Sequence, residues 1–421
     1  MTAVTFAAMV NGANPLLEHY NTPHNTIPFN LIKNEHFMPA FKEAMKVHNE
    51  EIAAIINNPK APDFNNTIVA LEEAGRLLSK VSSPFYNLLS SETNDELQKI
   101  AEEVSPLLTE HSNAISLNEK LFERVKAVYA TKDKLKLTPE QKMLLNNTYD
   151  GFVRRGANLS EEKKEKYREL SKELSMLTLK YGQNVLKETN AWSLLITDKS
   201  LLAGLPADVL DMLALNAKNA KKEGWLLNLK ATTYVPVMKY AQNRDLRREL
   251  YMAYTTRNMK GGEYDNREIL RKIADVRLQI ANLMGYKSHA DFVLEKRMAE
   301  NKENVYNLLD KLLAAYKPVA EKEYTEVQKY ADSNGAYFKV MPWDWSFYSD
   351  KLKDEKYELN DEILKPYFEL ENVKKGVFGL ATKLYGIRFV KNPSIPVYHP
   401  EVDAYDVLDE KGKFVAVLYT D

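Results

Sequence analysis

Cysteine is absent from the 421 residues. Its absence excludes disulfide scaffolds, thiolate nucleophiles and every zinc or iron–sulfur site that is built on cysteine. Any metal ion would therefore have to bind to histidine, aspartate or glutamate. Glycine is also scarce: it accounts for 15 of the 421 residues, or about 3.6%, against an average of about 7%. Because turn-rich all-β folds need many positions with positive φ, this scarcity favours a helical protein.

No charge of one sign dominates the sequence. The 58 lysines and arginines nearly balance the 59 aspartates and glutamates, and the net charge is -1. Such a chain has no strong positive field to attract a phosphate backbone, so we predict no nucleic-acid partner. Long apolar runs are missing too. The longest stretch without a charged side chain, residues 1–17, contains Asn, Thr and Gly, and we therefore predict no membrane-spanning helix.

The N-terminal residues leave the cellular compartment open. Residues 3–10 form a short apolar run that is followed by small residues, as in a signal peptide, but no Lys or Arg precedes it. Residues 1–13 are thus either a signal remnant or an ordinary chain end. The corresponding locations of the protein are the periplasm and the cytoplasm.

The hydrophobic pattern predicts a mainly α fold with short β segments. Thr93 and Thr138 each begin a capping-box sequence that marks the start of a helix. Helical periodicity is expected over these ranges: 34–57, 67–89, 160–188, 244–254, 266–284, 289–298 and 302–332. Two short segments, 192–197 and 226–233, are predicted to pair as a β-ribbon.

The C-terminal residues follow the pattern of a β-hairpin. Tyr405–Leu408 and Phe414–Thr420 flank a polar turn that contains Gly412. The printed sequence ends inside the second strand, so we expect that the chain is cut short. An unpaired apolar strand at this place would expose an edge that invites association. Alternatively, the strand folds back on the helices and is buried.

The seven histidines do not form a zinc motif. Their positions are 19, 24, 36, 48, 111, 289 and 399, so none of them stands four residues from another in a His-Glu-x-x-His arrangement. We therefore expect no catalytic residue and no metal ligand in this chain. His48 is interpreted as a core residue that makes one hydrogen bond, and His289 as part of a helix cap. His399 lies in a loop between Tyr398 and Pro400 and is kept as a functional candidate.

One aromatic cluster could bind a ligand. Residues 342–348 contain two tryptophans, a phenylalanine and a tyrosine around Asp344. A carboxylate between two indoles could line a sugar or peptide subsite. Alternatively, Trp345 and Tyr348 pack as neighbours on a helix that begins near Asp344, with this aspartate as its cap. Neither a Gly-x-Ser-x-Gly nucleophile motif nor a phosphate-binding loop is present.

Seven segments of the chain resemble one peptidase family. They are similar to the N-terminal part of zinc metallopeptidases of the peptidyl-dipeptidase Dcp, oligopeptidase A and thimet oligopeptidase family. The similar segments are Asn14–Leu17, Lys33–Phe41, Pro62–Glu72, Tyr264–Arg267, Met284–Asp291, Trp343–Trp345 and Tyr398–Val402.

The resemblance implies a two-lobed helical shell around a channel, one catalytic zinc ion, and cleavage of short peptides with release of C-terminal dipeptides. It further implies that this chain stops before the zinc-binding helix, so that it lacks bound zinc and is inactive alone. The expected regions are an N-terminal helical region, 14–235, and an incomplete first part of the peptidase domain, 236–421. We predict that Trp345, Tyr348, His399 and Tyr419 line the substrate channel, and that the complete enzyme is a monomer.

A second hypothesis belongs to another functional class. The chain would then be a non-catalytic helical binding protein, or a carbohydrate-active shell that uses the aromatic cluster at 342–348. A stop codon directly after codon 421 would favour this alternative.

Overall fold

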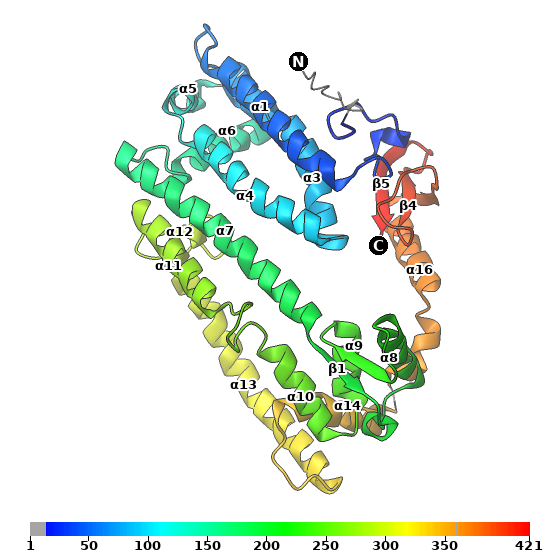
Figure 1. Cartoon of the computed structure of the whole chain (residues 1–421). Coiled ribbons are helices and arrows are strands. Elements are labelled where there is room, and N and C mark those ends of the chain that lie inside the picture. The colour runs from blue at the N-terminus through cyan, green and yellow to red at the C-terminus, as the bar shows by residue number, and fades with distance from the viewer. Residues whose placement is uncertain (1–13, 359) are drawn as a thin grey trace, which may run out of the picture. The chain divides into compact units, whose positions relative to one another are not determined.

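The computed structural model describes residues 14–358 and 360–421, and the predicted signal remnant at 1–13 lies outside them. Most of the described residues are helical, and the strands are few and short (Figure 1). This confirms the mainly α prediction. Nowhere in the described part is there a helix with the length and apolar character needed to cross a membrane.

The chain forms two compact units. The first unit holds the described residues up to Met176 together with Leu370–Asp421, and the second unit is Leu177–Glu369. Helix α7, Glu161–Ala191, contributes residues to both units. The predicted boundary near residue 235 concerns the family's domains and remains a prediction.

The first unit is built mainly from helices that share an apolar core. Side chains from α1, α5 and α6, including Ile52, Leu121 and Phe152, are buried together in this core. The N-terminal helices of the unit are α1 Phe37–Ile56, α2 Ala70–Glu73, α3 Arg76–Ser91, α4 Asp95–Ser116, α5 Glu119–Tyr129 and α6 Pro139–Arg154.

The predicted helix 67–89 is interrupted, which corrects the sequence analysis. Gly75 has φ of 77° between α2 and α3, and its N–H donates a hydrogen bond of 2.7 Å to Oε2 of Glu51. A Cβ atom at this position would lie 2.8 Å from the ring of His48. Glycine is therefore required both by the left-handed conformation and by the close approach of the ring.

Two predicted helix starts have different outcomes. At the start of α6, the Thr138 hydroxyl accepts from the Gln141 N–H and the Gln141 side chain accepts from the Thr138 N–H, so this capping box is confirmed. The prediction for Thr93 was wrong by one residue, because Asn94 is the N-cap of α4 and accepts from the N–H of Leu97 at 2.9 Å. Asparagine caps as well as threonine does.

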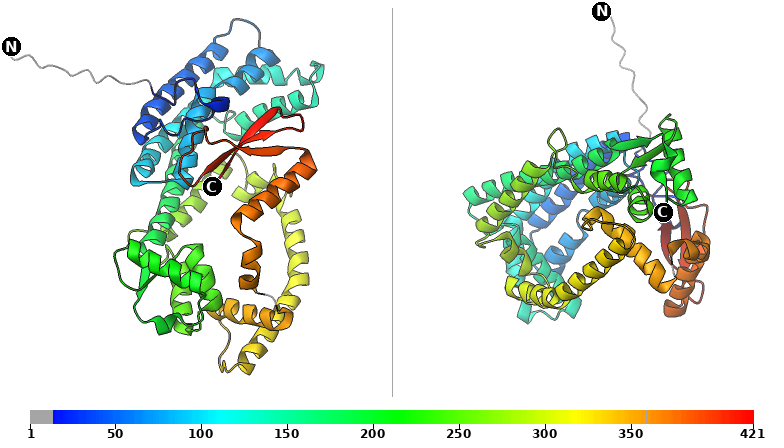
Figure 2. Two further views of the ribbon diagram at one scale, coloured as in Figure 1. Left: turned by 90° about the vertical axis from the view of Figure 1, so that its right-hand side faces the viewer. Right: turned by 90° about the horizontal axis from the view of Figure 1, so that it is seen from below.

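The C-terminal part of the first unit is a helix followed by a small sheet. Helix α16, Leu370–Tyr385, leads into strands β3 Arg388–Lys391, β4 Asp403–Leu408 and β5 Phe414–Thr420 (Figure 2). The strands pair antiparallel in the order β3-β4-β5. The predicted hairpin is therefore confirmed, and within the described residues β5 pairs with β4 alone.

The second unit combines helices with a two-stranded ribbon. Strands β1 and β2 pair antiparallel, with Ser193 opposite Asn228, which confirms the predicted ribbon in a shorter form. The elements of this unit besides α7 are β1 Ser193–Ile196, α8 Ala207–Asn219, β2 Trp225–Asn228, α9 Ala231–Tyr240, α10 Arg244–Thr255, α11 Arg267–Leu283, α12 His289–Leu294, α13 Lys302–Ser333, α14 Pro342–Tyr357 and α15 Asp361–Leu364.

Candidate functional site

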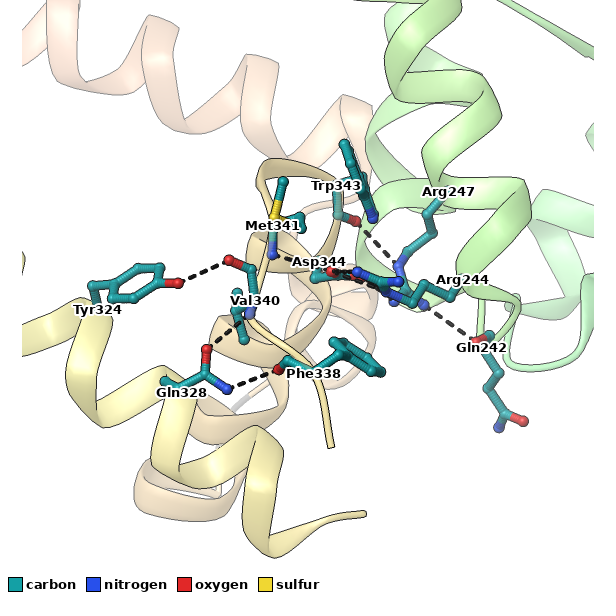
Figure 3. Close-up of polar contacts among 10 residues, drawn as sticks. All are labelled: Gln242, Arg244, Arg247, Tyr324, Gln328, Phe338, Val340, Met341, Trp343 and Asp344. Carbon is teal, nitrogen blue, oxygen red and sulfur yellow. Dashed lines mark hydrogen bonds and ion pairs between the residues drawn. The ribbon is translucent and has the colours of Figure 1, made fainter. Parts of the chain in front are cut away.

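The aromatic segment 342–348 forms the first two turns of α14 in the second unit. The helix begins at Pro342, and Oδ2 of Asp344 accepts a hydrogen bond of 3.1 Å from the N–H of Met341 (Figure 3). Asp344 thus caps the helix from its third position rather than from the position before it. Its carboxylate is completely buried.

Two arginines from the start of α10 neutralise this carboxylate. Arg244 donates to both carboxylate oxygens of Asp344, with Nη2 2.8 Å from Oδ2. Nη2 of Arg247 lies 2.9 Å from Oδ1, and Nε of the same side chain donates to the carbonyl of Trp343. Figure 3 shows both guanidinium groups converging on Asp344. Both carboxylate oxygens of Asp344 accept hydrogen bonds from the fold, and the residue is completely buried. The geometry therefore supports the structural interpretation of Asp344 and leaves this carboxylate no free oxygen for a ligand.

The two predicted channel residues on α14 differ in exposure. The Trp345 side chain is partly exposed, at 36%, and its ring is parallel to that of Tyr324 at 6.2 Å between centroids. Tyr348 is buried against Phe338 and Phe347, and burial raises the pKa of its hydroxyl. Trp345 therefore still offers a surface to a ligand, whereas Tyr348 serves mainly as a core residue of the second unit.

Tyr419 lies on strand β5 of the first unit and contacts the segment that precedes α1, residues 14–36, which we call the N-terminal lead-in. Its ring packs edge to face with Phe29 at 6.3 Å, and its hydroxyl lies 3.5 Å from the carbonyl of Pro396. Burial raises the pKa of Tyr419. At the other end of β5, the ring of His24 stacks on Phe414 at 3.7 Å. The lead-in thus covers side chains of β5, while the main-chain edge of the strand is unpaired within the described residues.

His399 lies in the loop before β4, and its side chain is accessible to solvent. Its side chain is 40% exposed, with Nε2 3.7 Å from Oε1 of Glu92. Nδ1 accepts a hydrogen bond of 3.2 Å from the N–H of Glu401. The loop geometry therefore fixes one ring nitrogen and leaves the other facing a carboxylate.

The remaining histidine assignments are partly confirmed. His48 makes one hydrogen bond, as predicted, and its partner is the buried His111, which the sequence analysis did not single out. The cap of α12 is the hydroxyl of Ser288, which accepts from the N–H of Asp291. The assignment of His289 to this cap was therefore wrong.

The residues present do not fit a catalytic zinc site. In the part of the chain that the structure describes, no three His, Asp or Glu side chains are grouped as metal ligands. The sequence also has no pair of histidines one helical turn apart. Zinc sites in enzymes need three such ligands, so no reaction step can be built through zinc on these side chains.

Comparisons with known proteins show to which class the chain is related. It is 37% identical over 413 residues to a dipeptidyl carboxypeptidase of Escherichia coli strain K12, which covers 97% of this chain and 60% of that protein. It is 32% identical over 412 residues to oligopeptidase A of Salmonella typhimurium strain LT2, with the same shares. A probable cytosolic oligopeptidase A of Arabidopsis thaliana is 30% identical and matches 97% of this chain and 59% of its own length. All three relatives are peptidases by name.

Residues 237–421 match the description "Peptidase family M3". Together with the relatives, this match confirms the resemblance to this peptidase family that the sequence analysis expected. The chain spans about 60% of the length of the curated relatives that it matches.

Proposed function

We propose that the chain is part of a zinc-dependent peptidase that hydrolyses short peptides and releases dipeptides from their C-termini. The observation that carries this proposal is the 37% identity to a dipeptidyl carboxypeptidase, which extends over 97% of the chain. A shared fold alone does not account for sequence similarity of this extent. The similarity therefore favours a peptidase over a non-catalytic helical binding protein or a carbohydrate-active shell.

The zinc ligands of this peptidase are proposed to lie outside the 421 residues. The distribution of the seven histidines supports this, since none forms the required helical pair. The chain by itself is then expected to bind no stoichiometric zinc and to be inactive. Its contribution to the reaction is to bind and orient the peptide.

Two surfaces are proposed to contact the peptide. The free main-chain edge of β5 can pair with an extended substrate regardless of its side chains, as sheet edges do in other peptide-binding proteins. Trp345 and His399 retain exposed area for side-chain contacts, and Tyr419 positions β5 through Phe29. Tyr348 is proposed to support Trp345 from the core rather than to touch the peptide.

Helix α13 supports the proposal that the whole protein is larger than the structure. One stripe of this helix exposes apolar side chains by half or more, among them Tyr306, Leu309, Leu313 and Tyr316. Monomeric proteins rarely leave such a stripe in water. We infer that further chain covers it in the whole protein, which is then a monomer in the periplasm or the cytoplasm.

The test is to express the complete open reading frame that contains these codons and, separately, the 421-residue chain. Both are incubated with an N-terminally blocked hexapeptide, and the products are identified by mass spectrometry. We expect the longer product to release C-terminal dipeptides until a zinc chelator is added, and the 421-residue chain to release none. A reading frame that stops after codon 421, hydrolysis that resists chelation, or hydrolysis by the short chain would each overturn the proposal.

A further inference from the structure

Four helices of the first unit border a cleft of ≈ 530 Å³. The volume lies within the range of about 300–1,000 Å³ that is usual for small-molecule sites. Much of the lining is apolar and comes from α1, α2, α4 and α6 and from Ala74, which directly follows α2. These apolar residues are Ile52, Leu71, Ala74, Ile115, Leu144 and Phe152.

A buried hydroxyl in the lining lacks a partner. Ser116, the last residue of α4, is 5% exposed. Its Oγ makes no hydrogen bond to any atom of the described residues. Buried hydroxyl groups in folded proteins are nearly always paired, because an unpaired one has lost its water without compensation. A ligand in the cleft that pairs with Ser116 would restore the missing bond.

An imidazole pair contributes the second polar group. His48 lines the cleft, and its Nδ1 lies 2.9 Å from Nε2 of the buried His111. Burial lowers the pKa of both rings, so both are neutral near pH 7. Nε2 of His48 has no hydrogen-bond partner in residues 14–358 and 360–421. The deep polar groups of the cleft are therefore uncharged.

The cleft is lined by one acidic and one basic residue, so it carries no net charge. Glu72 and Arg155 are the charged residues of the lining, and both are exposed. Glu51, beside His48, is already engaged by the N–H of Gly75. One acidic and one basic group give no preference for an anion or a cation, so the surroundings favour an uncharged ligand.

A glycine inside a helix keeps the cleft open. Gly151 lies within α6 and lines the cleft, and a Cβ atom built on it would meet no atom within 4 Å. Packing therefore does not require glycine here, and helix propensity disfavours it. The missing side chain leaves space that almost any other residue would fill.

We propose that this cleft binds a small, uncharged aromatic molecule that carries one hydroxyl or ring N–H group. The apolar walls take the ring, and the polar group pairs with the unpartnered hydroxyl of Ser116, beside the neutral ring of His48. Rings from Phe152 and His48 in the lining favour an aromatic body over an aliphatic one. The proposal does not depend on the peptidase function.

The experiment titrates the full 421-residue chain with indole by ligand-observed NMR, and with indene as the isostere that lacks the N–H group. We expect saturable binding of indole at one site. Indene should bind at least about fivefold more weakly, because the loss of one hydrogen bond lowers the affinity by about this factor. Ser116→Ala should weaken indole binding by a similar factor, whereas Ser112→Ala, an exposed position on the same helix, should not.

Gly151→Leu should weaken indole binding, because the new side chain occupies part of the cleft. The matched control is Gly182→Leu, because Gly182 is also a helical glycine with no atom within 4 Å of a built Cβ, and it lies outside the cleft. Circular dichroism checks that both variants keep their helices. If Gly151→Leu unfolds, the Ser116→Ala comparison decides alone. The proposal is overturned if indole does not bind saturably, if indene binds equally well, or if a folded Gly151→Leu variant binds indole as before.

Discussion

Replacing Asp344 by asparagine should destabilise the second unit more than the loss of any exposed charge. The substitution keeps the shape of the side chain but removes the negative charge that faces Arg244 and Arg247. Arg247 is 1% exposed, so its positive charge would remain buried without a counter-ion. Breaking a buried ion pair in this way costs about 3–5 kcal/mol.

The contacts that remain set the expected size of the effect. Arg247 would still donate to the carbonyl oxygens of Ala241, Gln242 and Trp343, and these bonds stabilise the charge in part. Arg244 is 34% exposed and can turn toward water. We therefore expect the lower end of the range, about 3 kcal/mol.

Urea unfolding followed by tryptophan fluorescence measures this loss. The four tryptophans, at 192, 225, 343 and 345, all lie in Leu177–Glu369, so their emission follows the second unit. With a slope of about 2 kcal/mol/M, the midpoint should fall by about 1.5 M urea. Glu268→Gln breaks an exposed pair with Arg271 and should cost at most about 0.5 kcal/mol. A loss for Asp344→Asn no larger than that of this control would refute the reasoning.

Three further predictions concern the first unit. Burial lowers the pKa of His48 and His111, so the stability of the first unit should be complete above about pH 7 and fall as the pH drops through about 6.5, where the unfolded chain takes up protons. Replacing both histidines by glutamine should flatten this pH dependence in urea unfolding followed by circular dichroism, and an unchanged slope would contradict the prediction. The ammonium group of Lys391 is the main cause that lowers the pKa of Asp403 to about 2. The stabilisation of the first unit by this ionised carboxylate should therefore be present above about pH 4 and be lost toward pH 2. Asp403→Asn should remove this loss of stability in acid, and an acid unfolding curve identical to that of the unchanged protein would disprove the prediction. The 421-residue chain should associate through the edge of β5, where Val415 is 55% exposed; Val415→Lys should reduce light scattering, and equal scattering by both chains would argue against a sticky edge.

Local signals in the sequence predicted most of the helices and strands. The capping box at Thr138 and the pairing of β4 with β5 depend on residues that are neighbours in sequence or flank a short turn. Strands β1 and β2 are separated by α8, and their composition and polar or glycine boundaries alone predicted them. The break at Gly75 was missed because one of the contacts that require glycine there, with the ring of His48, comes from another helix. The cap of α4 was misplaced because Thr93 and Asn94 are both good caps, and only the backbone path selects between them.

Long-range pairs could not be predicted from periodicity. Asp344 meets Arg244 across 100 residues of sequence, and His48 meets His111 across 63. In both cases the residue types are common on helices, and only tertiary packing brings them together. The candidate channel residues were chosen by their aromatic or loop context, which does not distinguish the exposed Trp345 from the buried Tyr348.

The zinc content of the 421-residue chain tests the central claim most directly. The chain is dialysed against zinc, then against metal-free buffer, and the bound metal is measured by elemental analysis. Because the described residues offer no group of three ligands, we predict far less than one equivalent of zinc. One equivalent of tightly held zinc, together with hydrolysis of a short peptide by this chain, would contradict the claim that the catalytic metal is bound elsewhere in the whole protein.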